Sequence, residues 1–269
     1  MRQVVAITGS TGGILSKVCI QLVLDNYDLV LINRNYAKTI EQRTELLKLN
    51  NVDIDIIVAD MSKMKDVKKV SNELKYRKID YMILSSAIYN VPIEKLDTGY
   101  NNVFQVNFLS PYYLINKLID KDMKFIIVGS VAYKYQSIDI NDIDLSNSKK
   151  QTHIYGNSKR YLMFSLMDNN KVTIAHPGIT LTNLTNHYPR WINWLVKIGI
   201  KLLFPSNKKA SRNILYALNH ETMNNEWIGP SIFNIWGKPK IKKIQIDEKE
   251  KQKIKENAYN IYKKLEEKK

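Results

Sequence analysis

The sequence of 269 residues predicts an α/β fold, in which a doubly wound parallel sheet is covered by helices on both faces of a single domain (1–269). Three observations predict it. Short runs of β-branched and apolar residues recur along the chain, segments with apolar residues at helical spacing lie between them, and a glycine-rich turn follows the first run. Such regular alternation favours a parallel sheet. Ligands of these sheets bind at the carboxyl ends of the strands, so we expect the functional residues there.

Each strand is expected to be followed by a helix. The six predicted strands are Val4–Thr8, Asp28–Ile32, Asp53–Val58, Tyr81–Leu84, Lys124–Val128 and Val172–Ala175. The helices between and after them are predicted at Ile14–Asn26, Thr39–Asn50, Met64–Tyr76, Val103–Asp120 and Tyr155–Met167.

Beyond Asn183 the pattern changes. Residues 187–205 form a dense apolar segment, HYPRWINWLVKIGIKLLFP, with prolines near both ends. This segment could be a helix packed on the core, a lid over an apolar substrate pocket, or a surface that touches a membrane. Residues 247–269 are rich in lysine and glutamate. They predict a solvated C-terminal helix with a narrow stripe of Ile254, Ala258, Ile261 and Leu265.

Composition limits the classes of function. The chain has 41 Lys+Arg against 26 Asp+Glu, a net charge of +15 that would attract nucleic acid, an acidic membrane surface or an anionic cofactor. The lysines are scattered and no nucleic-acid recognition module is readable, so we expect a solvated basic surface and no nucleic-acid partner. A nucleic-acid binder is kept only as a remote alternative.

Neither a membrane span nor a secretory signal is readable, because the sequence has no run of 18 apolar residues and no apolar stretch ahead of a cleavage site. A cytoplasmic protein is therefore expected, with peripheral membrane contact left open. Cys19 has no partner for a disulfide and the four histidines lack metal-ligand spacing, so Cys19 is interpreted as a core residue and no metal site is expected.

The first strand runs into the turn Thr8-Gly-Ser-Thr-Gly-Gly-Ile-Leu15 and then into a helix. Glycines at such a turn let backbone N–H groups approach a pyrophosphate, which the positive end of the helix also favours. The lysine of a P-loop is absent, which disfavours a mononucleotide hydrolase. A dinucleotide is the expected ligand.

Arg34 lies directly after the second strand. An acidic residue near this position suits the ribose 2′-hydroxyl of NAD, whereas the charged planar fork of an arginine suits a 2′-phosphate. Arg34 therefore favours NADP (NADPH) over NAD.

Tyr155 and Lys159 are four residues apart in a predicted helix, so their side chains share one face. A nearby ammonium stabilises a phenolate, so Lys159 is expected to lower the pKa of Tyr155 and make it usable for proton transfer. The pair alone is common by chance. Ser130, however, follows the fifth strand and could hydrogen-bond a substrate carbonyl.

Two further motifs point to the same edge of the sheet. Asn107 stands in the middle of a helical pattern, where asparagine is a middling helix former and usually has a specific role. The turn His176-Pro177-Gly178 closes the sixth strand, and its backbone could meet a nicotinamide carboxamide.

Taken together and in this order, these motifs resemble the short-chain dehydrogenases/reductases, with a Rossmann-like fold, over nearly the whole chain. The sequences of the segments GSVAY, YGNSKRYLMF and HPGITLTNL are most similar to those of the retinol dehydrogenase and WW-domain oxidoreductase branch.

The resemblance implies a role for each motif residue. Tyr155 would act as general acid or base, Ser130 would polarise the carbonyl, Lys159 would bind the nicotinamide ribose, and Asn107 would anchor a proton-supplying water chain. Asp60 would accept from the adenine amino group. The cofactor-binding set that it implies is Gly9, Ser10, Thr11, Gly13, Ile14, Arg34, Asp60, Met61, Ser86, Ala87, Tyr155, Lys159, Pro177, Gly178, Ile179 and Thr182.

Two departures from the family pattern concern the cofactor. Leu15 stands where the family has a third glycine, and is expected to push the first helix outward. Leu84-Ser85-Ser86-Ala87 replaces the usual Asn-Asn-Ala-Gly, so the amide contacts between neighbouring strands are expected to be lost.

The leading hypothesis is an NADP-dependent oxidoreductase that interconverts an alcohol and a carbonyl on a fairly apolar small molecule. A homodimer is compatible with the resemblance. The alternative is a non-catalytic NADP-binding sensor or scaffold protein of the same fold, which Leu15 and the altered segment motivate. The complete set of Asn107, Ser130, Tyr155 and Lys159 speaks against this alternative.

Overall fold

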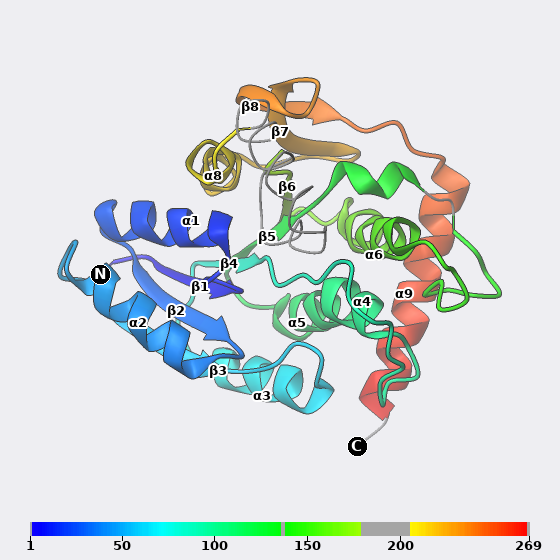
Figure 1. The fold of residues 1–269 in the computed structure, drawn as a ribbon, viewed down its shortest axis with the longest axis horizontal. Helices are drawn as coiled ribbons and strands as arrows, with labels where there is room; N and C mark the ends of the chain where they lie inside the picture. The colour runs from blue at the N-terminus through cyan, green and yellow to red at the C-terminus, as the bar shows by residue number, and fades with distance from the viewer. Residues whose placement is uncertain (1, 136–137, 179–204, 268–269) are drawn as a thin grey trace, which may run out of the picture.

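A computed structural model describes residues 2–135, 138–178 and 205–267. Its centre is one sheet with the strand order β3-β2-β1-β4-β5-β6-β7-β8, in which all neighbours pair in parallel except β7 and β8 (Figure 1). The strands are β1 (Val4–Thr8), β2 (Asp28–Asn33), β3 (Ile54–Val58), β4 (Tyr81–Leu84), β5 (Lys124–Val128), β6 (Val172–Ala175), β7 (Glu226–Ile232) and β8 (Trp236–Lys243).

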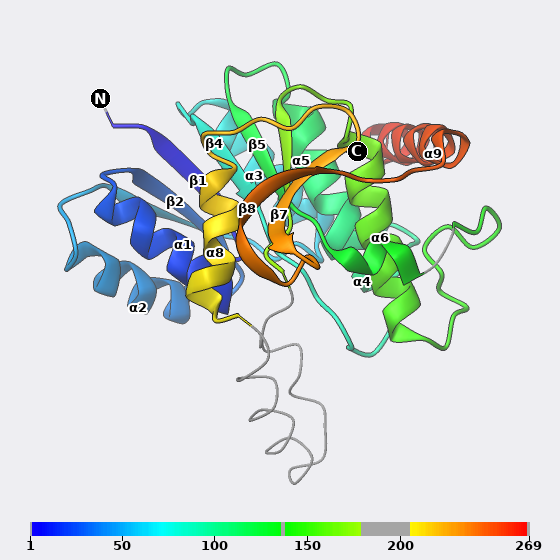
Figure 2. The ribbon, with the colours of Figure 1, turned by 90° about the horizontal axis from the view of Figure 1, so that it is seen from above.

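Helices cover both faces of this sheet (Figures 1 and 2). They are α1 (Gly13–Leu24), α2 (Tyr36–Leu47), α3 (Met64–Lys75), α4 (Asn102–Phe104), α5 (Ser110–Leu118), α6 (Gln151–Leu166), α8 (Asn207–Tyr216) and α9 (Glu248–Glu267). A π-helical turn, η1 (Gln105–Leu109), joins α4 to α5, and a 3₁₀ turn, η2 (Val131–Tyr135), follows β5. The predicted doubly wound α/β fold is confirmed.

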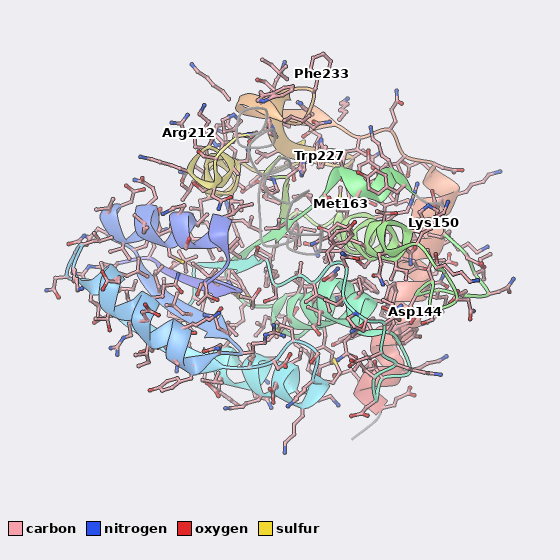
Figure 3. All side chains as sticks on the ribbon, viewed as in Figure 1. Asp144, Lys150, Met163, Arg212, Trp227 and Phe233 are labelled. Atoms are coloured by element: carbon pink, nitrogen blue, oxygen red, sulfur yellow. The ribbon has the colours of Figure 1, made fainter. Side chains whose placement is uncertain are left out.

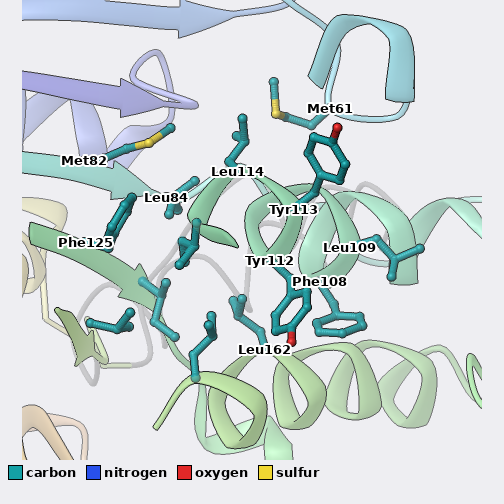
Figure 4. Close-up of a cluster of buried hydrophobic side chains, with 14 of the residues drawn as sticks. Met61, Met82, Leu84, Phe108, Leu109, Tyr112, Tyr113, Leu114, Phe125 and Leu162 are labelled. Atoms are coloured by element: carbon teal, nitrogen blue, oxygen red, sulfur yellow. The ribbon is translucent and has the colours of Figure 1, made fainter. Parts of the chain in front are cut away.

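The period of two in the strands divides the buried residues between two cores. On β1, Val5 and Ile7 face α1 and α8, whereas Ala6 faces the opposite core with α3, α5 and α6. Because the central strands are buried on both faces, they read in the sequence as continuous apolar runs. The core that contains Ala6 also includes Met82, Phe108 and Leu162 (Figure 4). In this core the ring centroid of Phe108 lies 4.9 Å from that of Phe104 and 5.2 Å from that of Tyr161.

The sequence locates the first six strands to within one residue at each end. It misses β7, β8 and α8. The hairpin is missed because of its turn chemistry: Phe233-Asn234-Ile235 joins β7 to β8 without the recognisable signal Asn-Gly, and β8 alternates lysine with glycine, proline and isoleucine. The predicted lid segment lies outside the described residues, apart from Pro205.

At the C-terminus, α9 packs along α6 and buries Ile254, Ala258, Ile261 and Leu265, the four residues of the expected stripe. Cys19 is fully buried in the core beside β1, in line with its interpretation as a core residue. No helix within the described ranges combines the length and the apolar character needed to cross a bilayer.

The strand order reverses at β1, which pairs with β2 on one side and β4 on the other. The helices after β1 and β4 lie on opposite faces of the sheet, and the carboxyl ends of two such strands are where doubly wound sheets bind their ligands. Thr8 and Leu84 are paired in register at that end, and β4 pairs with β5 in turn. The turns after β1, β4 and β5 therefore converge on one edge.

Candidate functional site

The glycine-rich turn after β1 requires its first glycine. Gly9 has φ +72°, and its N–H donates to Ile32 O at 3.0 Å, while the N–H of Gly12 donates to Gly9 O at 3.0 Å. A Cβ at Gly9 would lie 3.2 Å from the backbone of Ser86, so Ser86 would have to move by a few tenths of an ångström to admit it. The turn thus packs directly against the segment after β4.

Ser10 supports this turn from beneath. Its hydroxyl accepts from Asn33 Nδ2 at 2.7 Å and donates to Gln42 Oε1 at 2.8 Å, and Gln42 Nε2 donates to Ser10 O at 2.9 Å. Ser10 is fully buried, as is most of Ile14, whereas Thr11 is exposed at the tip of the turn. The sequence alone gave no sign of Gln42, because its role depends on α2 lying beside the turn.

Leu15, which was expected to displace α1, is buried in the same core as Ala210 and Ile214 of α8. Leu15, at the position of the family's third glycine, is therefore accommodated by apolar packing between α1 and α8. Asn207, the first residue of α8, lies so close to the turn that a Cβ at Gly13 would come within 2.6 Å of its Nδ2.

An open pocket of about 590 Å³ lies at the carboxyl ends of β2 and β3. Its lining residues are Arg34, Asn35, Tyr36, Val58, Asp60, Lys63 and Asp66. Asp60 is held in place because its Oδ1 accepts from the N–H of Ser62 at 2.9 Å and from its hydroxyl at 2.8 Å. Met61 is buried and faces the core, and its carbonyl accepts from the Ser110 hydroxyl at 2.6 Å. Arg34 and Asp60, both predicted site residues, thus share one pocket.

The segment after β4 keeps its connection to β1 without the family's amides. The Thr8 hydroxyl oxygen accepts from the N–H of Ser85 at 3.0 Å and of Ser86 at 3.3 Å. The segment has no amide side chains, as expected, and the Thr8 hydroxyl on β1 provides the contact between the neighbouring strands in their place. Ser86 is half-buried against the turn, and Ala87 is exposed.

Asn107 lies at the centre of the π-helical turn and is fully buried. Its Oδ1 accepts from Ile88 N at 2.8 Å, and its Nδ2 donates to Ile88 O at 3.0 Å and to Ser158 Oγ at 3.1 Å. One side chain therefore ties the segment after β4 to α6. Single π-turns within α-helices occur frequently at functional sites.

The predicted tyrosine and serine meet. Ser130 follows β5, Tyr155 lies in the second turn of α6, and the Ser130 side chain is close enough to the Tyr155 hydroxyl to lower its pKa. The Ser130 oxygen also accepts from Ala132 N at 3.2 Å, which orients it. Tyr155 is half-buried, and Tyr89 makes an edge contact with its ring, 5.1 Å between centroids.

Lys159 is 2% exposed, and its Nζ donates to Val128 O at 3.0 Å at the end of β5. The Nζ atom lies 5.9 Å from the centroid of the Tyr155 ring. The lysine is therefore beside the ring, as the spacing of four residues predicts, and is anchored on the strand that carries Ser130.

The expected direction of the Tyr155 pKa is wrong. Burial raises the pKa of Tyr155 to about 12, although the Ser130 hydrogen bond lowers it in part. Burial also lowers the pKa of Lys159 to about 8. Desolvation disfavours the charged form of both groups, and here it outweighs the attraction that the sequence argument assumed.

The turn after β6 closes the site on the far side. His176 is buried and stacks on Trp227 at 4.8 Å, with its Nδ1 3.4 Å from Gly129 O and its Nε2 3.3 Å from Asn234 O. Burial lowers the pKa of His176 to about 4. Gly178 has φ +90°, so this turn also needs glycine. Ile179 and Thr182 lie outside the described residues.

The structure therefore brings together Ser130, Tyr155 and Lys159, with Asn107 behind them, and places the glycine turn at the neighbouring strand end. Arg34 and Asp60 lie further along the same edge, at β2 and β3. Within the described ranges, no cluster of histidine, cysteine and acidic side chains could hold a metal ion.

Comparison with known proteins decides the family. The model of the short chain dehydrogenase family matches residues 3–142, more than half of the chain. The chain belongs to the short-chain dehydrogenase family. It is 26% identical over 209 residues to retinol dehydrogenase 14 of Mus musculus, a match that covers 68% of this chain and 63% of that protein. It is also 24% identical over 148 residues to the WW domain-containing oxidoreductase of Pongo abelii, covering 52% of this chain and 35% of that one.

These relatives confirm the resemblance inferred from the motifs. The matched part of this short-chain dehydrogenase spans less than two thirds of their length. Among solved structures, an uncharacterised protein from Mycobacterium paratuberculosis has a TM-score of 0.73 at 17% identity, covering 98% of this chain and 92% of that one. A short-chain dehydrogenase from Sphingobium yanoikuyae in complex with NADPH has a TM-score of 0.60 at 16% identity, covering 81% and 84%. These likenesses establish the fold.

Substituting Gly9 tests the turn. Gly9→Ala should destabilise the protein by about 1–2 kcal/mol, because φ is positive, and should also weaken dinucleotide binding, because the new Cβ displaces Ser86. Gly99 is the matched control, since its φ is +90° but a Cβ there meets nothing within 4 Å. Gly99→Ala should show the loss of stability alone. Urea denaturation and a fluorescence titration with NADPH measure both effects. Equal dinucleotide affinity in the two variants would contradict this account of the turn.

Proposed function

We propose that this short-chain dehydrogenase is an NADP-dependent oxidoreductase that interconverts a carbonyl and an alcohol on a small, fairly apolar molecule. The observation that carries the proposal is the proximity of the Ser130 and Tyr155 side chains, with the buried cation of Lys159 beside the phenol ring. Ser130 follows β5, and Tyr155 and Lys159 lie on α6, at the edge of a parallel sheet where ligands bind. There, these groups could polarise and protonate a substrate carbonyl.

The residues at the glycine turn fit a dinucleotide. Gly9 and Gly12 bring backbone close to the surface at the start of α1, where the helix favours an anion. Arg34 and Lys63 place two cations on the pocket at β2 and β3, which suits a 2′-phosphate, and Asp60 in the same pocket can accept from an adenine amino group. The solved relative from Sphingobium yanoikuyae contains NADPH, which supports the same choice here.

NADPH supplies a hydride when it is bound, and the protein supplies the proton and the positioning. Ser130 would donate a hydrogen bond to the substrate carbonyl oxygen, and Tyr155 would protonate that oxygen as negative charge develops on it. An alkoxide is a much stronger base than a phenolate, so a phenol with a pKa of about 12 is still a competent acid. The raised pKa therefore favours the reductive direction, since oxidation would need the phenolate.

Lys159 and Asn107 would have supporting roles. The Lys159 ammonium is held at Val128 O, where it would stabilise the phenolate left by proton transfer and could donate to the ribose hydroxyls of the cofactor. The Asn107 amide makes hydrogen bonds to Ile88 and Ser158, so its side chain would hold the segment after β4 in position against α6. A water molecule would bind at the irregular π-turn around it.

A non-catalytic NADP-binding protein of the same fold is the second candidate, and it is favoured by the two departures from the family pattern, Leu15 and Leu84-Ser85-Ser86-Ala87. The two candidates differ in one measurement. NADPH oxidation with a panel of aldehydes and ketones should be detectable for an enzyme, whereas tight NADPH binding without turnover of any member would support the sensor.

Removal of the proposed acid gives the sharpest test. Tyr155→Phe should lower kcat for carbonyl reduction by roughly 10²–10⁴ and leave NADPH affinity nearly unchanged, because only the proton donor is lost. Tyr161→Phe, on the same helix but with its hydroxyl beside Asn257, is the control and should retain activity. Full activity in the Tyr155 variant would refute its assigned role.

Arg34 tests the choice of cofactor. Arg34→Ser should raise the KM for NADPH roughly 10- to 100-fold, since a charge-assisted contact with the 2′-phosphate is lost, and should leave the KM for NADH nearly unchanged. Arg77→Ser, a surface arginine paired with Asp55, is the control. Equal effects on the two cofactors would argue against NADP preference through Arg34.

The pH profile tests the buried lysine. The pKa of Lys159 is lowered to about 8, so its ammonium is present below that pH and is lost above it, while Tyr155 stays protonated to about pH 12. The value of kcat/KM for reduction should therefore fall above about pH 8. Measurement between about pH 6 and pH 10 checks this, with Lys159→Met expected to lose both the inflection and most of the activity. A flat profile through this range would count against a catalytic ammonium.

A further inference from the structure

The loop between β7 and β8 exposes large apolar side chains. Phe233 is 83% exposed, Ile232 is 51% exposed and Trp236 is 41% exposed, all within five residues of one hairpin. Figure 3 shows Phe233 at the outer edge of the molecule, at the end formed by β7 and β8. Single exposed apolar residues need no explanation, but three at one tip form a patch.

The backbone at this tip is strained for the residue it carries. Phe233 has φ +49° and Asn234 has φ +58°, and Ile235 N donates to Ile232 O at 3.0 Å across the turn. Positive φ at both central positions defines a turn that prefers glycine or asparagine, and a bulky aromatic residue is an outlier there. Phe233 is therefore unfavourable in both its conformation and its exposure. The stability of the fold explains neither the positive φ of Phe233 nor its exposure.

Lysines accompany the apolar tip. A bulge beside Gly237, which has φ +96°, adds one residue to β8 between Trp236 and Pro239, so the face of the strand beyond it is not the face of Trp236. Lys238 and Lys240 are exposed on this further face, beside the apolar tip. Lys242, next on this face, instead turns inward and donates to Pro230 O and, at 2.9 Å, to Asn234 Oδ1, which fixes the turn. In the described part of the chain, no acidic group pairs with Lys238 or Lys240.

We propose that this hairpin patch, defined as Ile232, Phe233, Trp236, Lys238 and Lys240, docks the protein on an anionic lipid bilayer, with Phe233 inserted among the headgroups. Aromatic and aliphatic residues at a projecting tip, next to lysines, suit an interface that is apolar within and negative at its surface. Lysines on an edge strand also deter edge-to-edge pairing, but that purpose does not require Phe233.

A second copy of the chain fits the patch less well. Two identical patches related by a twofold axis would bring the same lysines near one another and leave them without opposite charge. A lipid surface that contains phosphatidylserine supplies that charge at any orientation of the hairpin.

The position of the patch connects docking to the proposed reaction. The hairpin lies against the turn after β6, where His176 Nε2 is 3.3 Å from Asn234 O and a Cβ at Gly178 would lie 3.3 Å from Ile235 O. β7 pairs in parallel with β6, so the tip lies at the same carboxyl edge as Tyr155 and the glycine turn. Docking would thus present this edge to the bilayer, in which apolar carbonyl compounds dissolve.

Vesicle co-sedimentation tests the proposal and needs no enzymatic readout, so it can fail or succeed independently of the proposed reaction. Extruded vesicles of phosphatidylcholine, with and without about 30% phosphatidylserine, serve as the probe. The wild-type chain should bind the anionic vesicles, more weakly as salt is raised. Phe233→Asn should reduce the partition coefficient by on the order of tenfold, because the inserted ring is lost.

The choice of asparagine separates docking from a structural role. Asparagine tolerates positive φ, so Phe233→Asn should raise the thermal midpoint while it weakens vesicle binding. Lys238→Gln with Lys240→Gln should remove most of the preference for anionic vesicles. The controls are Tyr76→Ala, at an 85% exposed tyrosine after α3, and Lys249→Gln with Lys253→Gln on α9, which should bind as wild type.

Three results would overturn the proposal. The first is a wild-type chain that binds neither kind of vesicle, which would leave the patch to a protein partner. The second is a Phe233→Asn variant that binds as well as wild type. The third is a wild-type chain that does not bind vesicles but forms a dimer in sedimentation velocity, where the Phe233→Asn variant is monomeric. That result would assign the patch to a second copy of the chain.

Discussion

The alignment of β1, β4 and β5 at their carboxyl ends is the constraint on which the rest of the site depends. Thr8 pairs with Leu84, and Leu84 pairs with Ile127, so three turns leave the sheet at one level. The Thr8 hydroxyl then holds the N–H groups of Ser85 and Ser86, and Asn107 holds Ile88. A shift of one residue in the register of one of these strands would turn its side chains to the wrong faces of the sheet and separate the glycine turn from Ser130.

Burial of the tyrosine and lysine has a definite electrostatic cost. The same desolvation that raises the pKa of Tyr155 lowers the pKa of Lys159, so both groups are shifted toward their neutral forms. Ser130 offsets part of the shift of Tyr155, and the hydrogen bond to Val128 O fixes Lys159 in place. A low-dielectric site of this kind strengthens each electrostatic contact that a substrate would make there.

The far end of the sheet differs in character. β6 ends in a buried turn stacked on Trp227, whereas β7 and β8 continue to a hairpin whose tip is apolar, strained and flanked by lysines. The two features are joined through Asn234, whose carbonyl faces His176 and whose side chain accepts from Lys242. An interaction at the hairpin would therefore act on a segment that is packed against the turn after β6.

The sequence by itself determined the six parallel strands, the glycine turn and the pairing of Tyr155 with Lys159, because these depend on periods of two and 3.6 residues and on local backbone requirements. It also indicated Ser130 and Asn107 by their places at the end of a strand and within a helix. Only the tertiary structure decided the direction of the Tyr155 pKa, the replacement of lost amides by Thr8, the support of Ser10 by Gln42, and the β7–β8 hairpin. Each of these depends on burial or on contact between residues distant along the chain, and neither can be obtained from local spacing.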